Sequence, residues 1–270
     1  MRLLKYNNTG KFSLTKDLVK DDKIPRYAIL SHTWGEDTEE VSLKDMMDGT
    51  GMSKPGYDKV QFCGEQARRD GLQYFWIDTC CIDKSNSTEV QEAINSMFRW
   101  YCNAAKCYVY LADVSRPALE ADGRPCHLPW ESAFRESKWF TRGWTLQELI
   151  APALVEFFSK EGEWLGDKRS LERHVYEVTR IPIKALQGNS LSDFTVDEIL
   201  LWAEDRDTTR GEDKAYSLLG FFDVHMPLIY GEGREKALRR LREEIDKASK
   251  GKLLLIACIH MDTLSVLGRR

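Results

Sequence analysis

The sequence lacks the motifs of several common kinds of site. It contains no CxxC pair, and the adjacent Cys80 and Cys81 lack the separated spacing of zinc ligands, so we expect no metal site. No GxGxxG loop follows a strand pattern, so the usual dinucleotide fingerprint is absent, and no Walker A sequence is present. A formal net charge of -4 gives no overall attraction for nucleic acid or anionic lipid.

Long apolar runs are also missing. The first ten residues have no sustained apolar core, and the late run Leu253 to Ile259 is too short to span a bilayer, so we expect neither a signal peptide nor a direct membrane span. Seven cysteines, an odd number, favour reduced thiols and a cytoplasmic location. A content of 42% hydrophobic and 30% charged residues is typical of a folded globular protein.

Three segments combine an apolar run with Trp, acidic, His or Cys residues. They are YAILSHTWGEDTEEV (Tyr27 to Val41), YFWIDTCCIDK (Tyr74 to Lys84) and SKWFTRGWTLQELI (Ser137 to Ile150). In the first two, the polar cluster lies where a buried strand should end. Ligands of open α/β sheets bind outside the carboxyl ends of the strands, so these clusters predict a site.

The first part of the chain predicts alternating strands and helices. Strands are expected over Tyr27–Ser31, Tyr74–Asp78, Cys107–Val114 and Leu154–Phe158, and helices over Tyr57–Arg69, over Arg142–Ile150 and from a capping box at Thr88 and Gln91. Such alternation indicates βαβ units and a mostly parallel sheet flanked by helices. Residues 115–130 form a Pro-containing loop, long enough for a lid or an insertion.

The second part predicts helices only. They are expected over Ser170–Arg180, Thr195–Asp205, Gly211–Phe221 and Gly233–Lys250. We therefore predict an α/β core over 1–165, a helical extension over 166–250 and a tail over 251–270.

Five motifs in order resemble the fungal heterokaryon incompatibility (HET) domain: YAILSHTWG, WIDTCCIDK, RGWTLQELIAP, TTRGEDKAYSLLGFF and LIYGEG. The resemblance runs from about Tyr27 to Ile245. Similar domains are N-terminal effector modules of larger receptor-like proteins, and they trigger cell death when genetically different fungal cells fuse. The resemblance implies a cell-death function and a receptor-like sensor as partner.

A weaker resemblance is to Toll/interleukin-receptor (TIR) domains. Ile29-Leu30-Ser31 with Gly35-Glu36-Asp37-Thr38, then Trp76-Ile77-Asp78, then Ser137 with Trp144, Leu146, Glu148 and Leu149, are similar to three motifs of that family. This resemblance implies a TIR-like (flavodoxin-like) fold, NAD as substrate rather than cofactor, homo-oligomeric activation and Glu148 as the catalytic residue of a NAD glycohydrolase. The His32-Thr33-Trp34 loop, the Cys80-Cys81 pair and the helical half depart from the TIR pattern.

NAD cleavage needs few groups. Nicotinamide leaves as a neutral base, so one carboxylate that stabilises the positive ribose can suffice, and Glu148 has that chemistry. The candidate substrate-binding residues are Ser31, His32, Thr33 and Gly35 for ribose or phosphate, Asp78 for a hydroxyl, and Trp34, Trp76 and Trp144 for a flat ring.

Each candidate also has a structural interpretation. Glu148 can be a surface acid paired with Arg142, Trp144 can be core, His32 can bond a backbone carbonyl, and Asp78 can cap a turn. The rival function is a non-enzymatic module that signals death by recruiting partners. A third alternative is an enzyme that acts on another nucleotide in the same crevice.

Overall fold

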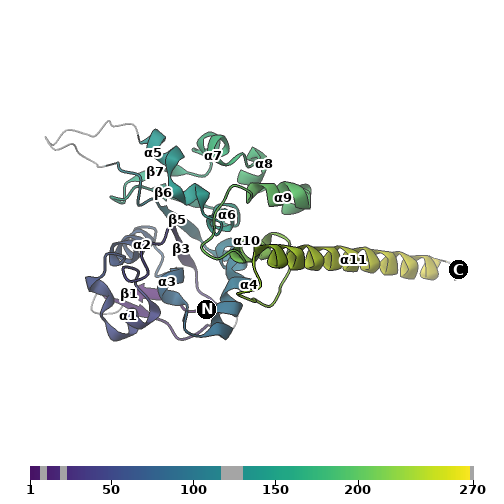
Figure 1. Cartoon of the computed structure of the whole chain (residues 1–270), viewed down its shortest axis with the longest axis horizontal. Coiled ribbons are helices and arrows are strands. Elements are labelled where there is room, and N and C mark those ends of the chain that lie inside the picture. Colours follow the sequence, from purple (N-terminus) through teal and green to yellow (C-terminus); the bar gives the residue numbers. More distant parts are fainter. Residues whose placement is uncertain (7–10, 19–22, 117–129, 268–270) are drawn as a thin grey trace.

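The computed structural model describes residues 1–6, 11–18, 23–116 and 130–267, with side chains through Lys250. A central sheet has helices on both faces, further helices pack beside one edge, and the last helix projects away from the body (Figure 1). Most of the loop expected over 115–130 lies outside the described residues.

The described residues form one sheet of seven strands in the order β2-β1-β4-β3-β5-β6-β7. The strands are β1 (Leu4–Tyr6), β2 (Phe12–Leu14), β3 (Tyr27–His32), β4 (Tyr74–Trp76), β5 (Lys106–Tyr110), β6 (Val155–Phe158) and β7 (Trp164–Asp167). Strands β4, β3, β5 and β6 are parallel neighbours, which confirms an α/β fold. The remaining pairings are antiparallel, so the sheet is mixed and the predicted parallel strands form its centre. A short turn joins β6 to β7, and such a connection allows only antiparallel pairing.

The pleat of β3 directs its side chains to opposite faces of the sheet. All six residues of this strand are buried, and Ser31 pairs with Val109 while His32 pairs with Tyr110. The Tyr110 ring contacts Phe62 of α2 (Tyr57–Arg69), so the His32 side chain lies on the α2 face. Ser31 therefore lies on the opposite face, which α4 (Ser87–Asn103) and α6 (Thr145–Ile150) cover (Figure 1).

The predicted helix Tyr57–Arg69 is confirmed, and Gly71 ends it with a φ of 72°. The capping box at Thr88 is wrong. Asn86 is the N-cap of α4, and its side chain accepts hydrogen bonds from the backbone N–H groups of Thr88 and Glu89. The shorter helices of this half are α1 (Leu43–Asp48), α3 (Asp78–Cys81) and α5 (Glu131–Glu136), with 3-10 turns η2 (Gly51–Ser53) and η3 (Lys138–Thr141).

Helix α6 begins three residues later than predicted. Gly143 donates its backbone N–H to the carbonyl of Asp207 at 2.8 Å, and Arg142 forms a parallel bridge with Asp207, so the chain is extended at Arg142. A Cβ added to Gly143 would lie 2.4 Å from the Thr208 methyl group, so only glycine fits this close approach. The start of α6 is thereby joined to the helical half.

The second half is helical, as predicted, but its helices are shorter than predicted except for the last, which is longer. They are α7 (Glu172–Thr179), α8 (Ile183–Leu186), η4 (Leu191–Asp193), α9 (Val196–Trp202), α10 (Asp213–Tyr216), η5 (Leu219–Phe221) and α11 (Arg234–Leu267). The helix expected over Gly211–Phe221 is split, because the turn after α10 brings Gly220 against Phe98. An added Cβ at Gly220 would lie 2.0 Å from the Phe98 Cβ.

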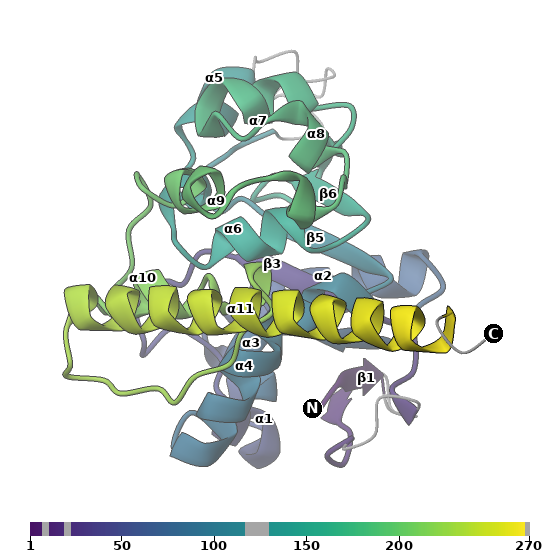
Figure 2. The same ribbon diagram turned by 90° about the vertical axis from the view of Figure 1, so that its right-hand side faces the viewer.

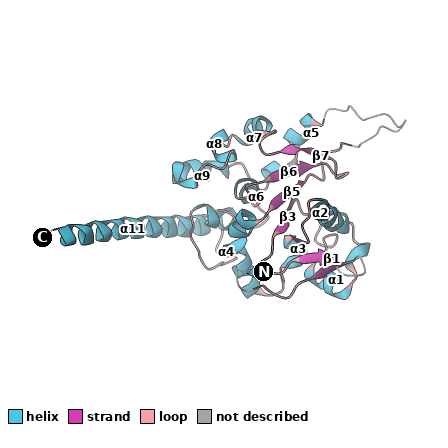
Figure 3. Ribbon diagram, turned by 180° about the vertical axis from the view of Figure 1, so that it is seen from behind, coloured by secondary structure: helices cyan, strands magenta, loops and turns pink. Residues whose placement is uncertain are grey.

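Helix α11 continues through the predicted tail to Leu267 and projects away from the sheet (Figures 1 and 3), so it crosses in front of the body in Figure 2. The sheet continues through β7 to Asp167, and one apolar core joins the sheet to the helical half from Leu3 to Ile245. Within the described ranges, no helix combines the length and the apolar character that a bilayer span requires.

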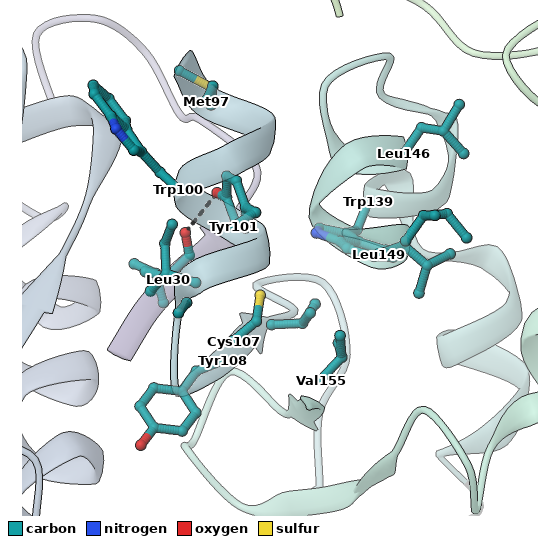
Figure 4. Close-up of a cluster of buried hydrophobic side chains, with 14 of the residues drawn as sticks. Leu30, Met97, Trp100, Tyr101, Cys107, Tyr108, Trp139, Leu146, Leu149 and Val155 are labelled. Carbon is teal, nitrogen blue, oxygen red and sulfur yellow. Dashed lines mark hydrogen bonds between the residues drawn. The ribbon is translucent and has the colours of Figure 1, made fainter. Parts of the chain in front are cut away.

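The core beside α6 joins the sheet to both neighbouring helices (Figure 4). Trp139 of η3 and Leu146 and Leu149 of α6 are fully buried opposite Tyr101 of α4. The Tyr101 hydroxyl donates to the carbonyl of Leu30 at 3.0 Å. This packing fixes α6 against the carboxyl-terminal half of β3.

Candidate functional site

Glu148 lies in this core beneath the carboxyl end of β3. Only 7% of the residue is exposed, so it is not the surface acid of the structural interpretation. Its carboxyl accepts a hydrogen bond from the hydroxyl of Ser31. The Trp139 indole N–H donates to the same hydroxyl oxygen at 2.8 Å. Because a serine hydroxyl has one hydrogen, the indole directs that hydrogen toward Glu148.

Burial raises the pKa of Glu148 to about 8. The hydrogen bond from Ser31 opposes the increase in pKa, whereas the negative charge of Asp78 adds to it. At pH 7 the carboxyl is therefore mostly protonated, and a small rise in pH ionises it. A carboxyl with this property, near the carboxyl edge of the sheet, is a candidate catalytic group.

Two buried cations hold the helix that carries Glu148. Lys168 donates to the carbonyls of Leu149 at 3.1 Å and Pro152 at 2.9 Å, so it satisfies the C-terminal end of α6. Arg206 approaches from the helical half and donates to the Thr145 hydroxyl at 2.9 Å.

Arg206 also donates to the Arg142 carbonyl at 3.0 Å, while its Nη2 atom has no partner among the described residues. Burial lowers the pKa of Arg206 to about 10, and the nearby Glu148 carboxyl opposes that decrease. Sequence reasoning missed Arg206, which lies two residues before the TTRGEDK motif.

His32 lies on the other face of the sheet. Its Nε2 atom is 3.9 Å from both the Glu40 Oε2 and the Asp78 Oδ1 atoms. Burial lowers the pKa of His32 well below 6.5, and the positive charges of Lys59, Lys84 and Arg142 lower it further. The imidazole is therefore neutral at pH 7.

The loop after β3 is fixed by Glu40, a residue that sequence reasoning also missed. One Glu40 oxygen accepts the backbone N–H of Gly35 at 2.6 Å and pairs with Lys59. Lys59 also donates to the Thr33 carbonyl at 3.3 Å. Thr33 is half-buried and Gly35 is exposed, so the loop reaches solvent from a rigid base.

The three candidate tryptophans have different environments. Trp34 is 40% exposed, and its indole N–H donates to Asp78 Oδ2 at 2.8 Å, so it can contact a ligand. Trp76 is fully buried edge-on against Trp100, so it has no face for a ligand and is not a stacking residue. Trp144 is half-buried and donates to Asp213 at 3.4 Å.

The remaining candidates are structurally simpler. Asp78 begins α3 but bonds Trp34 instead of capping that helix. Cys80 and Cys81 are buried, as the small-apolar interpretation predicts. Among the residues that the structure describes, no three His, Cys, Asp or Glu side chains form a group able to hold a metal ion.

The site thus has two halves that meet at the carboxyl edge of the sheet. Ser31 and Glu148 form one half, His32 and Trp34 form the other, and Asp78 acts electrostatically on groups of both. A cavity of about 570 Å³ lies elsewhere, at the amino end of β4, and it is not part of this site. Its lining includes Lys5, Tyr6, Arg68, Gly71, Leu72, Gln73 and Tyr74.

Comparison with known proteins agrees with the HET motifs. Residues 27–131 match the family model described as heterokaryon incompatibility protein (HET). The chain carries a HET domain. This chain is 64% identical to the vegetative incompatibility protein HET-E-1 of Podospora anserina over 247 residues, which are 92% of the chain. The chain spans 18% of the length of that relative. No solved structure matches the chain.

Proposed function

We propose that this HET chain is a cytoplasmic cell-death effector domain of heterokaryon incompatibility, and that it cleaves NAD when it self-associates. The similarity to a vegetative incompatibility protein supports the biological role. Because the chain spans 18% of that relative, we further propose that it acts within, or beside, a larger receptor-like sensor. The observation that carries the enzymatic proposal is the buried Glu148 carboxyl, whose pKa is raised to about 8.

The proposed reaction breaks the bond between nicotinamide nitrogen and the ribose anomeric carbon. The bonding electrons leave with nicotinamide, which departs neutral, and a positive charge develops on the ribose. Ionised Glu148 stabilises this charge, and water then adds to the anomeric carbon and loses a proton, giving ADP-ribose. Ser31 orients the carboxyl through its hydrogen bond, and Trp139 orients Ser31.

The buried position of Glu148 supports activation by proximity. In this structure 7% of the Glu148 residue is exposed, and its carboxyl is mostly protonated at pH 7. Substrate access requires that its surroundings open, and the greater solvation that follows lowers the pKa and favours ionisation at pH 7. Self-association provides a physical cause for such a change, because contacts between copies stabilise whichever conformation forms them.

We also propose a TIR-like, flavodoxin-like arrangement for the parallel core. Numbered along the chain, its four parallel strands lie in the order second, first, third and fourth. Doubly wound folds of the flavodoxin type share this order, and they bind ligands where the first and third strands meet. His32 ends the first parallel strand at that point.

The test is NAD consumption by purified protein at dilute and at crowded concentrations, beside Glu148→Gln. Nicotinamide release by the wild type but not by Glu148→Gln is the expected result. Glu163→Gln, which changes an exposed acid to the same amide, is the matched control and should retain the wild-type rate. Equal turnover by a folded Glu148→Gln protein refutes the assigned role.

Toxicity in cells separates this proposal from the interaction module. If Glu148→Gln abolishes both turnover and killing, catalysis causes death. If the folded variant still kills although no NAD is consumed, the non-enzymatic module is the better account. If the wild type consumes a different nucleotide, the assignment of the site to Glu148 is kept, and that nucleotide replaces NAD as the substrate.

A further inference from the structure

His32 and Asp78 form a polar group on the α2 face of the sheet, and the proposed chemistry at Glu148 does not use it. His32 Nε2 and Asp78 Oδ1 are both buried, and neither atom has a hydrogen-bond partner among the described residues. Their separation of 3.9 Å is too long for a direct hydrogen bond. Buried polar atoms without partners are costly, so two that face each other need an explanation.

Once the side chains around these two buried atoms move to admit a ligand, one hydroxyl group of that ligand satisfies both atoms. Placed about 2.8 Å from each, it donates its hydrogen to the Asp78 carboxylate. Its oxygen accepts a hydrogen bond from His32 when the neutral imidazole carries its proton on Nε2. The nearby Glu40 Oε2 atom, 3.9 Å from the same nitrogen, offers an acceptor for a neighbouring hydroxyl. Two adjacent hydroxyls are a feature of ribose.

The same carboxylate fixes an aromatic surface. Asp78 uses its other oxygen, Oδ2, to accept the Trp34 indole N–H at 2.8 Å. The Lys84 amine lies 3.4 Å from the centre of the Trp34 ring. Since 40% of Trp34 remains exposed beside the Lys84 amine, the residue has surface available for a flat ligand ring. The surface for a ligand ring on Trp34 is therefore adjacent to the position of the ribose hydroxyl at Asp78.

Two cations that form no direct ion pair among the described residues act on this polar group. Neither Lys84 nor Arg142 forms an ion pair within the described chain, and both act electrostatically on His32. Lys59, in contrast, is paired with Glu40. An anionic group next to the ribose would give Lys84 a direct partner, because its amine lies at Trp34 and interacts with Asp78 only through space.

We propose that Trp34, Asp78, His32 and Lys84 bind a nucleoside monophosphate unit, with the base on Trp34, a ribose hydroxyl between Asp78 and His32, and the phosphate at Lys84. This subsite lies across the sheet edge from Glu148. A dinucleotide can therefore occupy both halves, one nucleotide on each face. Only the binding of a dinucleotide across both halves rests on the proposed NAD cleavage, because binding of a mononucleotide needs no catalysis.

The experiment is isothermal titration calorimetry with AMP and with adenosine. The proteins are the wild-type chain, Trp34→Ala, Trp34→Phe, Lys84→Met and, as a matched control, Lys184→Met, an exposed lysine of α8. Circular dichroism establishes that each variant is folded. We expect Trp34→Ala to weaken AMP binding roughly 5- to 150-fold, and Trp34→Phe to restore most of it.

Lys84→Met should weaken AMP binding about tenfold but leave adenosine binding unchanged, while Lys184→Met changes neither. Wild-type binding that Trp34→Ala and Lys84→Met leave intact overturns the proposal, as does the absence of AMP binding at millimolar concentration. Glu148→Gln distinguishes the two proposals. If Glu148→Gln binds AMP like the wild type while neither of these two proteins consumes NAD, the nucleotide subsite stands and the proposed NAD cleavage fails.

Discussion

The buried carboxyl of Glu148 predicts an unusual dependence of stability on pH. Its pKa rises from 4.5 in the unfolded chain to about 8 in the folded protein. At about 1.4 kcal/mol per pKa unit, the ionised carboxyl is at most about 5 kcal/mol less favourable in the folded state than in the unfolded state. Replacing Glu148 by Gln removes this ionisation and keeps a side chain of nearly the same shape.

The sign follows from proton binding. Between pH 4.5 and about 8 the folded state keeps the Glu148 proton, while the unfolded chain has released it. Stability falls with rising pH wherever the folded state binds more protons, so the contribution of Glu148 is lost across this window. Between pH 5 and pH 7 this group alone should lower the free energy of unfolding by about 2.5 kcal/mol.

The assay is urea unfolding of the wild type and Glu148→Gln at pH 5, 6, 7 and 8. His32 and Asp78 also have shifted pKa values, but both are present in the two proteins, so the difference between the curves isolates Glu148. The exposed control Glu163→Gln should follow the wild type. A difference between wild type and Glu148→Gln that is constant across this range, within about 0.5 kcal/mol, would refute the argument from burial.

Three further substitutions test the fold. Lys168→Met leaves two carbonyls at the end of α6 without their buried donor and should cost about 1.5–3 kcal/mol in urea unfolding; a loss below 0.5 kcal/mol on the same scale contradicts the capping role. Asn86→Ala should destabilise α4 by about 1 kcal/mol and Thr88→Ala by clearly less, and the reverse order in chemical denaturation would restore the capping box at Thr88. Gly220→Ala forces a methyl group onto Phe98 and should lower stability by about 1–3 kcal/mol, measured by thermal unfolding; an unchanged melting temperature argues against that contact.

Local patterns predicted much of the fold. The buried run at β3 and the helix Tyr57–Arg69 depend on neighbouring residues, and both are confirmed. The three-residue strands β1 and β2 carry too little periodicity to be recognised, and their pairing with β4 depends on distant contacts. The start of α6 was misplaced because Asp207, 65 residues beyond Arg142, keeps that residue extended.

The site was only partly predictable for a similar reason. Ser31, His32, Trp34 and Asp78 follow apolar strand patterns, so their position at the sheet edge could be foreseen. The hydrogen bond between Ser31 and Glu148 spans 117 residues of sequence, and no local pattern reports it. The sequence around a Trp in an apolar strand, such as Trp76, is the same whether the ring faces the core or a ligand. Only the packing of α4 against Trp76 shows that it is a core residue.

The alternation of β3 also changes how the candidate residues are understood. Ser31 and His32 are adjacent in sequence, yet the sheet separates their side chains, so one small ligand on a single face cannot contact both. Asp78 is the electrostatic link between the halves, because its charge raises the pKa of Glu148 while its carboxylate holds Trp34. Ligand groups that donate to Asp78, or a cation drawn toward it, reduce that charge effect and favour ionisation of Glu148. A ligand bound on the Trp34 face would therefore favour the ionised form of Glu148 on the opposite face. An enzyme that acts on a two-part substrate requires this order of events.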